Sequence, residues 1–487
     1  MRKGTDIGLF LLLLAYLVWV PMPFGSASDA SQLPLVVPPL LICAGASLLR
    51  VSRGTPFEMT RAARIWTIGG ILFAVVIGFQ LVPMPMSLLH VLSPQSAAIW
   101  ARAGRLATLA DVPSPLLYPI TLDPSATSLH FFRTLAYLAT FLAALMLVYD
   151  RLRRTAMASV LAALAVFEAL YAVNEAATGR YAVWGWKNVL IFGRATGTFV
   201  NPNHFAHYAA ILLPMSLYLS AYAWHTAAPA GAQFSRRFAK LIERRLLPFS
   251  CGLLAALASV AAVLVSESRG AMLAIIAGFA IVGGIASPSR RGALRAVLIG
   301  GGVIAAIVAI VIFLGRTETL GRIEQSQASQ VGSRAASIVG AIRIWEMFPL
   351  LGSGAGTYQD VVLMTRATSS VVLANHAHDD YAEILATTGS LGFAIALASL
   401  LGGYFALAKN AFSEEDGEPM SWRRRAFKAA ALASIAIAMI HALVDFNFFI
   451  PANPITLAAI AGAAVVAKES RSSGHGAAEE RGSSLLD

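Results

Sequence analysis

Long apolar runs with almost no charge dominate the chain and constrain its fold more than any other feature. Each run approaches the ~20 residues with which a helix crosses the hydrocarbon core of a bilayer. A soluble fold could not cover this surface, because hydrophobic residues make up 57% of the chain and charged residues only 13%. The sequence therefore predicts an all-α polytopic membrane protein with about 12 transmembrane helices. The runs centre on Ile7–Val20, Leu33–Leu49, Trp66–Val82, Phe132–Val148, Ala156–Ala172, Phe205–Tyr222, Phe249–Val265, Ala271–Ile285, Val297–Leu314, Leu391–Ala408, Ala429–Val444 and Ile455–Ala467.

The basic residues follow the pattern of membrane proteins. A net charge of +11 would favour a nucleic-acid partner in a soluble chain. When the loops are assigned alternately to the two sides of a membrane, with the N-terminus inside, every inside segment is basic. Most of the 37 Lys and Arg residues fall in those segments, as the positive-inside rule requires. We therefore expect both termini in the cytoplasm and no nucleic-acid partner.

The predicted organisation is one transmembrane domain over residues 1–467, followed by a Ser-, Gly- and Glu-rich cytoplasmic tail at 468–487 that we expect to be disordered. Three long outside loops lie at 84–131, 178–204 and 315–388. Loops of this length with organised content usually carry function, so we expect the functional site on the outer face.

Two of these loops contain patterns typical of short helices. In the first loop, residues 92–104 predict an interfacial helix with Trp100 at headgroup level. In the third loop, apolar residues recur at helical spacing from Arg334 to Phe348 and stop at Pro349, which predicts an amphipathic helix along the membrane face. The glycine-rich stretch 352–356 then predicts a flexible turn.

Two arginines of the outside loops are candidates for binding an anion. Arg269 lies in a turn of only a few residues between two apolar runs, which places it at the membrane surface, where a charge is costly without a partner. Arg194 lies directly before the run at Phe205. Two guanidinium groups at one site would suit a phosphate or diphosphate. The alternative for Arg269 is a pair with Glu267 or snorkelling to headgroups, and for Arg194 it is capping of the next helix.

The residues around these arginines would support a ligand site. Glycines and an Asn-Pro-Asn sequence follow Arg194 and would let the backbone approach a ligand closely. Asn203 could equally cap the following helix. Arg334 belongs to the predicted amphipathic helix, which could also be a packed lid with solvated arginines. The supporting candidates in these segments are Asn201, Asn203, His204 and Arg334.

The stretch Asn375–Gly392 concentrates reactive side chains against the start of an apolar run. A neutral imidazole accepts a proton from a hydroxyl near pH 7, and a neighbouring carboxylate can orient the ring. His378 is the candidate for this role, at the start of a helix expected near Asp379. Whether His376 or His378 is the base stays open. The supporting candidates here are His376, Asp379, Asp380 and Tyr381.

Neither metal nor disulfide chemistry is indicated. Cys43 and Cys251 both lie inside apolar runs, as small buried side chains do, and no zinc-type ligand spacing occurs. Four further polar residues lie near the outer ends of the predicted spans, and we expect them to form helix–helix hydrogen bonds: Glu168, Glu175, His441 and Asp445.

Several motifs together resemble the O-antigen ligase and polymerase family of bacterial membrane glycosyltransferases. These are RATGTFVNPNHFAHY, SESRGAMLA, RIWEMFPLLGSGAGTY, HAHDDYAEILATTGSLG and HALVDFNFFIPANP, with TLDPSAT and SLHFFRTLAYLATF before them. The resemblance runs over roughly residues 190–455 and rests on the order and outside placement of the motifs. It implies a helical fold of the GT-C class in a bacterial inner membrane.

The resemblance also implies an activity. Family members transfer a glycan from an undecaprenyl-diphosphate carrier to a sugar hydroxyl of a glycan or of lipid A-core, within the membrane lipid and without metal or cofactor. By this likeness Arg194 and Arg269 match the arginines that bind the donor diphosphate, and His378 matches the histidine that activates the acceptor. The family's His-Asn-Asp-Tyr sequence is here His378-Asp379-Asp380-Tyr381, which adds a carboxylate beside the histidine.

Two other classes of function remain as alternatives. A transporter or flippase of an anionic or lipid-linked solute would place charges near the middle of the membrane in broken helices. A non-enzymatic assembly partner of other envelope proteins would not depend on His378 or Arg269.

Overall fold

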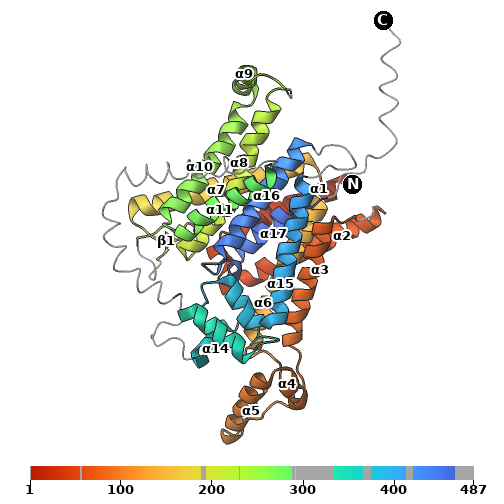
Figure 1. The fold of residues 1–487 in the computed structure, drawn as a ribbon, viewed down its shortest axis with the longest axis vertical. Helices are drawn as coiled ribbons and strands as arrows, with labels where there is room; N and C mark the ends of the chain where they lie inside the picture. Colours follow the sequence, from red (N-terminus) through yellow and green to blue (C-terminus); the bar gives the residue numbers. More distant parts are fainter. Residues whose placement is uncertain are drawn as a thin grey trace.

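In the part of the chain that the structure describes, the protein is a bundle of long α-helices with one short β-hairpin (Figure 1). The computed structural model describes residues 2–54, 58–187, 193–229, 231–287, 291, 334, 336–365, 375–412 and 421–466. The long helices are α1 (Arg2–Trp19), α2 (Gln32–Ser52), α3 (Arg61–Gln80), α6 (Pro124–Leu147), α7 (Arg151–Thr178), α8 (Pro202–Thr226), α10 (Leu246–Val265), α11 (Arg269–Ala286), α15 (Asp380–Phe412), α16 (Trp422–His441) and α17 (Ala452–Ala464).

The helices confirm the all-α, multi-pass prediction. Every predicted apolar run in the described part of the chain falls on one long helix, while Val297–Leu314 and the tail 468–487 lie outside the described residues. Among the residues that the structure describes, seven helices are long and apolar enough to cross a membrane, and Thr5–Trp19 and Ala452–Ala464 are shorter apolar helices. The count of 12 spans and the GT-C arrangement stay predictions. The seven helices are α2, α3, α6, α7, α10, α11 and α15.

Helix α8 is extensively buried within the bundle. It packs against α7, α10 and α16, while α15 packs against α3, and α17 packs against α6. Every residue of α8 from Pro202 to Ser216 is buried. Small residues permit close packing between the other helices, since a Cβ on Gly278 of α11 would lie 2.6 Å from Ile437 of α16. The N-terminal end of α8 is thereby fixed among α7, α10 and α16.

Smaller elements extend the bundle at its two ends. At one end α4 (Met86–Leu92) and α5 (Pro94–Leu109) project furthest, with helix 336–347 and α14 (Tyr358–Val362) between them and the bundle; α9 (Phe234–Arg244) projects from the other end (Figure 1). Helix α5 and helix 336–347 confirm the two short helices predicted in the loops. The hairpin pairs β1 (Ala182–Val183) with β2 (Trp186–Lys187). Short 3-10 turns lie at Phe24–Ser26, Asp29–Ser31, Leu363–Thr365 and Asn447–Phe449.

The glycine-rich stretch 352–356 is tightly packed, so the prediction of a flexible turn is wrong. Gly354 has a φ of 117° and Gly356 a φ of 81°. A Cβ on Gly356 would lie 2.3 Å from the His130 ring, and one on Gly354 would lie 2.1 Å from the Thr121 hydroxyl. These glycines are needed because other chain segments approach the backbone closely.

Candidate active site

Arg194 is held between the start of α8 and the end of α10. Its Nε donates to the carbonyl oxygen of Ser266 at 2.9 Å, and its Nη2 donates to Oδ1 of Asn203 at 2.9 Å. Asn201 caps α8 by accepting the N–H of Asn203 at 2.9 Å. In the described part of the chain two of the guanidinium N–H groups are thus used, and the other donors can meet a ligand. Asn203 therefore orients Arg194, while the capping role belongs to Asn201.

Arg269 is the first residue of α11 and is exposed. The turn before it is tight, because Glu267 has a left-handed φ of 57° and Ser268 caps the helix by accepting the N–H of Ala271. Only two residues separate Arg269 from Ser266, the carbonyl partner of Arg194. The two arginines are near enough for their charges to interact, and burial is the main factor that lowers the pKa of Arg194 below its ordinary value. Glu267 is the charge that acts most strongly on Arg194, so this region brings Arg194 and Arg269 together beside a carboxylate.

His378 lies against Asp445, a residue 67 positions further along the chain. Its Nδ1 is 3.4 Å from Oδ1 of Asp445, and its backbone has a left-handed φ of 55°. The expectation that Asp379 or Asp380 orients this ring is wrong. Asp379 accepts the N–H of Ala382 at 3.0 Å and so caps α15, and both oxygens of Asp380 accept the N–H of Phe448 at 3.1 Å.

Asp445 also connects His378 to Arg334 and His204. Its Oδ2 is 3.7 Å from Nη2 of Arg334, and its Oδ1 is 3.7 Å from Nε2 of His204. Asp445 is only 1% exposed. Burial by itself would raise the pKa of this carboxyl, but the imidazoles of His204 and His378 outweigh it and hold the pKa well below its usual range. Asp445 is therefore a buried anion shared by three side chains from different parts of the chain.

His376 has a different carboxylate partner. Its Nδ1 is 2.8 Å from Oε1 of Glu383, whose other oxygen accepts the N–H of Ala377 at 2.7 Å. Glu383 is 1% exposed. The His376 ring stacks on Phe446 with the centroids 4.1 Å apart, and the His378 and His204 rings contact the same Phe446 edge-on at 5.0 and 4.4 Å. Three imidazoles therefore surround one phenyl ring.

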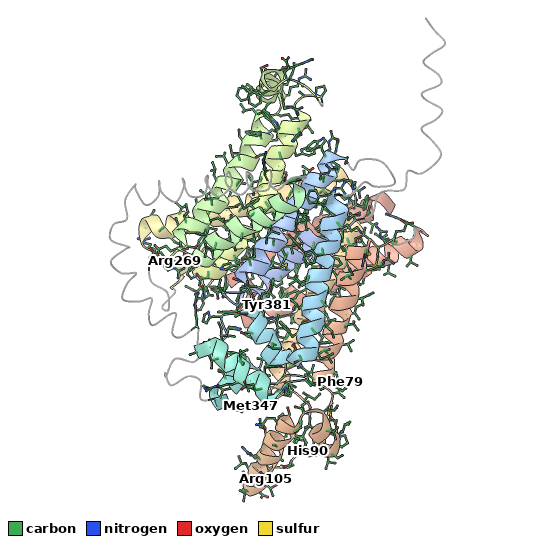
Figure 2. All side chains as sticks on the ribbon, in the orientation of Figure 1. Phe79, His90, Arg105, Arg269, Met347 and Tyr381 are labelled. Carbon is green, nitrogen blue, oxygen red and sulfur yellow. The ribbon has the colours of Figure 1, made fainter. Side chains whose placement is uncertain are left out.

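An apolar cavity of about 310 Å³ lies beside this cluster, among α3, α6, α15 and α17. Tyr381, His130 and Phe449 line it. Tyr381 donates its hydroxyl to the carbonyl oxygen of Met439 at 2.9 Å. The His376 ring lies 5.3 Å from Phe449, so the cavity reaches the histidine cluster. Tyr381 and Arg269 lie at similar heights along the long axis of the bundle (Figure 2).

The predicted site residues thus fall into two groups. Arg334, His376, His378 and His204 gather around Asp445 and Phe446, and Arg194, Asn203 and Arg269 gather at the α8 and α10–α11 ends. Asn201, Asp379 and Asp380 instead bond backbone groups, and Tyr381 faces the apolar cavity. Within the described ranges no group of three or more His, Cys, Asp or Glu side chains is arranged to hold a metal ion.

Asp445 is the main residue that the sequence interpretation missed. It was expected only to bond a neighbouring helix, as His441 does by pairing with His207 at 3.1 Å between their Nδ1 atoms. The available signal was an aspartate directly after an apolar run, at the same predicted outer face as His378. That signal did not identify its partner.

The fold and this cluster define a multi-pass helical membrane protein with a histidine, aspartate and arginine site at one end of its spanning helices. The sequence profile of the O-antigen ligase family matches residues 254–397, less than half of the chain. This segment includes Arg269, Arg334 and His378, and the match confirms the resemblance to the O-antigen ligase and polymerase family. Comparison with curated proteins gives no match.

Proposed function

We propose that the protein is a membrane glycosyltransferase that moves a glycan from an undecaprenyl-diphosphate carrier to a sugar hydroxyl. The acceptor is a growing glycan or lipid A-core, so the enzyme is a repeat-unit polymerase or an O-antigen ligase. The observation that carries the proposal is the convergence of His378, Asp445 and Arg334 within the same part of the fold as Arg194 and Arg269. The family match supports the same class of reaction.

In this proposal Arg194 and Arg269 bind the donor diphosphate. Arg194 is already oriented by its hydrogen bonds to Ser266 and Asn203, so little side-chain freedom is lost when the donor binds. Guanidinium groups match phosphate oxygens with paired N–H donors. They would also stabilise the negative charge that builds on the leaving diphosphate. Because the arginines supply this charge, the proposed mechanism needs neither metal nor cofactor.

His378 is the proposed general base. If Asp445 accepts the Nδ1–H of His378, the lone pair on Nε2 is left to take the acceptor proton. The acceptor oxygen then attacks the anomeric carbon, the bond from that carbon to the diphosphate oxygen breaks, and the electron pair leaves with the diphosphate. A single displacement inverts the anomeric configuration, so a retained configuration in the product would contradict this step.

The surroundings of the site fit a lipid-linked substrate. The apolar cavity beside His376 is lined mainly by α3, α6, α15 and α17 side chains, and burial of a prenyl or acyl chain there would be favourable by about 0.8 kcal/mol per CH₂. We place the site on the periplasmic face of the inner membrane, with both termini cytoplasmic, because α9, at the opposite end of the bundle (Figure 1), carries five Lys or Arg positions in or directly after it.

The test is transfer in proteoliposomes from an undecaprenyl-diphosphate glycan to two acceptors, a second lipid-linked glycan and lipid A-core. Wild-type protein should transfer to one of them. His378→Ala should lower kcat by about 10²–10⁴-fold, the usual contribution of a positioned base. Arg269→Ala should weaken use of the donor. Unchanged turnover in both variants would defeat the site assignment.

The same vesicles test the alternative, a transporter or flippase of an anionic or lipid-linked solute. Solute uptake or lipid flipping without any glycan transfer would favour that class over a transferase. The proposal expects no net movement of the lipid carrier that depends on His378.

A further inference from the structure

We infer that Glu175 and Glu168 of α7 are positioning residues for Arg194. Their carboxylates hold the backbone of residues 196–198 and thereby fix where the Arg194 side chain leaves the loop. The inference rests on the proposed role of Arg194 in binding the donor diphosphate. It replaces the expectation that these glutamates bond a neighbouring helix, because their partners belong to a loop.

Glu175 holds two consecutive backbone N–H groups of this loop. Its Oε2 accepts the N–H of Thr196 and that of Gly197, both at 2.9 Å, and its Oε1 accepts the Thr196 hydroxyl at 3.3 Å. Glu175 is 1% exposed. Without the carboxylate two buried N–H groups would lose their partner, which is costly away from water. Thr196 is two residues from Arg194, so the anchor acts close to the arginine.

Glu168 holds the next residue in the same way. It is fully buried, and its Oε2 accepts the N–H of Thr198 at 3.0 Å. Its Oε1 is 2.6 Å from the Thr198 hydroxyl, which is also 2.9 Å from the carbonyl oxygen of Pro21.

The two glutamates are seven residues apart, so they occupy one face of α7, two turns apart. The loop lies tightly against that face. Gly197 has a left-handed φ of 56°, and a Cβ there would lie 2.5 Å from Oε2 of Glu168 and 2.5 Å from Phe205. The Arg194 guanidinium is meanwhile bonded to groups at the ends of α8 and α10. The loop backbone at residues 196–198 and the Arg194 guanidinium are therefore both held in place. A shift of the loop would move the guanidinium.

The experiment measures the Kd of the full-length protein for undecaprenyl diphosphate in nanodiscs. Glu175→Ala should raise this Kd about tenfold. Glu175→Gln should restore binding to within about threefold, because its amide oxygen can still accept both backbone N–H groups. If Glu175→Ala does not fold, Glu175→Asp takes its place, since its carboxylate is one CH₂ shorter and cannot reach the loop.

The matched control is Asp6 of α1, a buried carboxylate that contacts the other end of α7. Asp6 accepts hydrogen bonds from Nη2 of Arg153 at 2.9 Å and from the Tyr149 hydroxyl at 2.7 Å. Arg153 lies 22 residues before Glu175 on α7, or about 33 Å along the helix. Asp6→Asn disturbs a comparable buried network and should leave the Kd unchanged.

A double-mutant cycle with Arg194 distinguishes a positioning role of Glu175 from a general effect on stability. In an Arg194→Ala background, Glu175→Ala should cause no further loss of binding, because the residue through which it acts is gone. Independent, additive losses would overturn the inference, and so would an unchanged Kd in Glu175→Ala while amide exchange at 196–198 accelerates. Failure of the proposed function looks different: wild-type protein would not bind the lipid diphosphate, or would bind it without glycan transfer.

Discussion

Replacing Asp445 by asparagine tests the pairing on which the proposed base depends. The carboxylate lies 3.4 Å from the His378 ring. Two unit charges about 4 Å apart interact by about 4 kcal/mol at an effective dielectric constant of about 20. The His378 side chain is 31% exposed, so we discount this to about 2 kcal/mol for solvent screening. Since about 1.4 kcal/mol corresponds to a tenfold change in rate, Asp445→Asn should lower kcat about 30-fold.

The effect can be larger than this charge estimate. The asparagine amide can donate to Nδ1 and so favour the wrong imidazole tautomer. The largest expected loss of kcat equals the whole contribution of the base, about 10²–10⁴-fold. Combining Asp445→Asn with His378→Ala should therefore be no worse than His378→Ala alone. The assay is single-turnover transfer with saturating donor, with thermal unfolding as the check on folding.

Asp379→Asn is the matched control for this change. Asp379 is next to the histidine in sequence, but its Oδ1 accepts the N–H of Ala382, and an asparagine oxygen can do the same. Its kcat should stay within about threefold of wild type. Wild-type kcat in Asp445→Asn, or an equal loss in Asp379→Asn, would refute the pairing.

Three further predictions concern donor binding and stability. Arg194→Lys should raise the donor KM by about 10-fold or more, because an ammonium cannot reproduce the planar set of donors; an unchanged KM in steady-state kinetics would contradict the donor role. Gly197→Ala should lower the free energy of unfolding by about 1–3 kcal/mol, since the methyl group meets Glu168 at a left-handed backbone position; a chemical denaturation curve equal to that of wild type would count against the packing. The lowered pKa of Asp445 adds stability that is complete above the unfolded value of about 3.9 and is lost as pH falls towards the folded value. Lowering the pH from about 5 to about 3 should therefore reduce the free energy of unfolding of the wild type more than that of Asp445→Asn.

The helices were predictable because their signals are local. An apolar run, its length and its end residues lie within about 20 residues of one another, and bilayer thickness fixes what such a run can do. The predicted start of the helix near Asp379 agrees with α15, which begins at Asp380. Asn201 and Ser268 cap α8 and α11 through equally local contacts, because their side chains reach N–H groups two or three residues ahead. The cap considered from the sequence was Asn203, two residues from the observed one.

The partners within the site were not predictable for the opposite reason. Three aspartates were available to His378, and two of them are its neighbours in sequence. The backbone N–H groups of Ala382 and Phe448 occupy those two, which leaves Asp445 to the ring. Which carboxylate is left over depends on how α15 and α16 pack, and no local pattern encodes that packing.

The buried glutamates of α7 show the same limit. Their positions near the outer end of an apolar run indicated that each needs a polar partner. The sequence could not show that the partners are the N–H groups of residues 196–198, because those groups exist at every residue and carry no sequence signal. The glutamate side chains predicted that a hydrogen-bond partner was needed, and only the fold showed which groups the partners are.

The most direct test of the account is a structure of the full-length protein bound to undecaprenyl diphosphate. We predict that the diphosphate lies within hydrogen-bond distance of both Arg194 and Arg269, with its terminal phosphate facing His378. A diphosphate bound elsewhere, with these two arginines contacting only protein, would contradict the central claim.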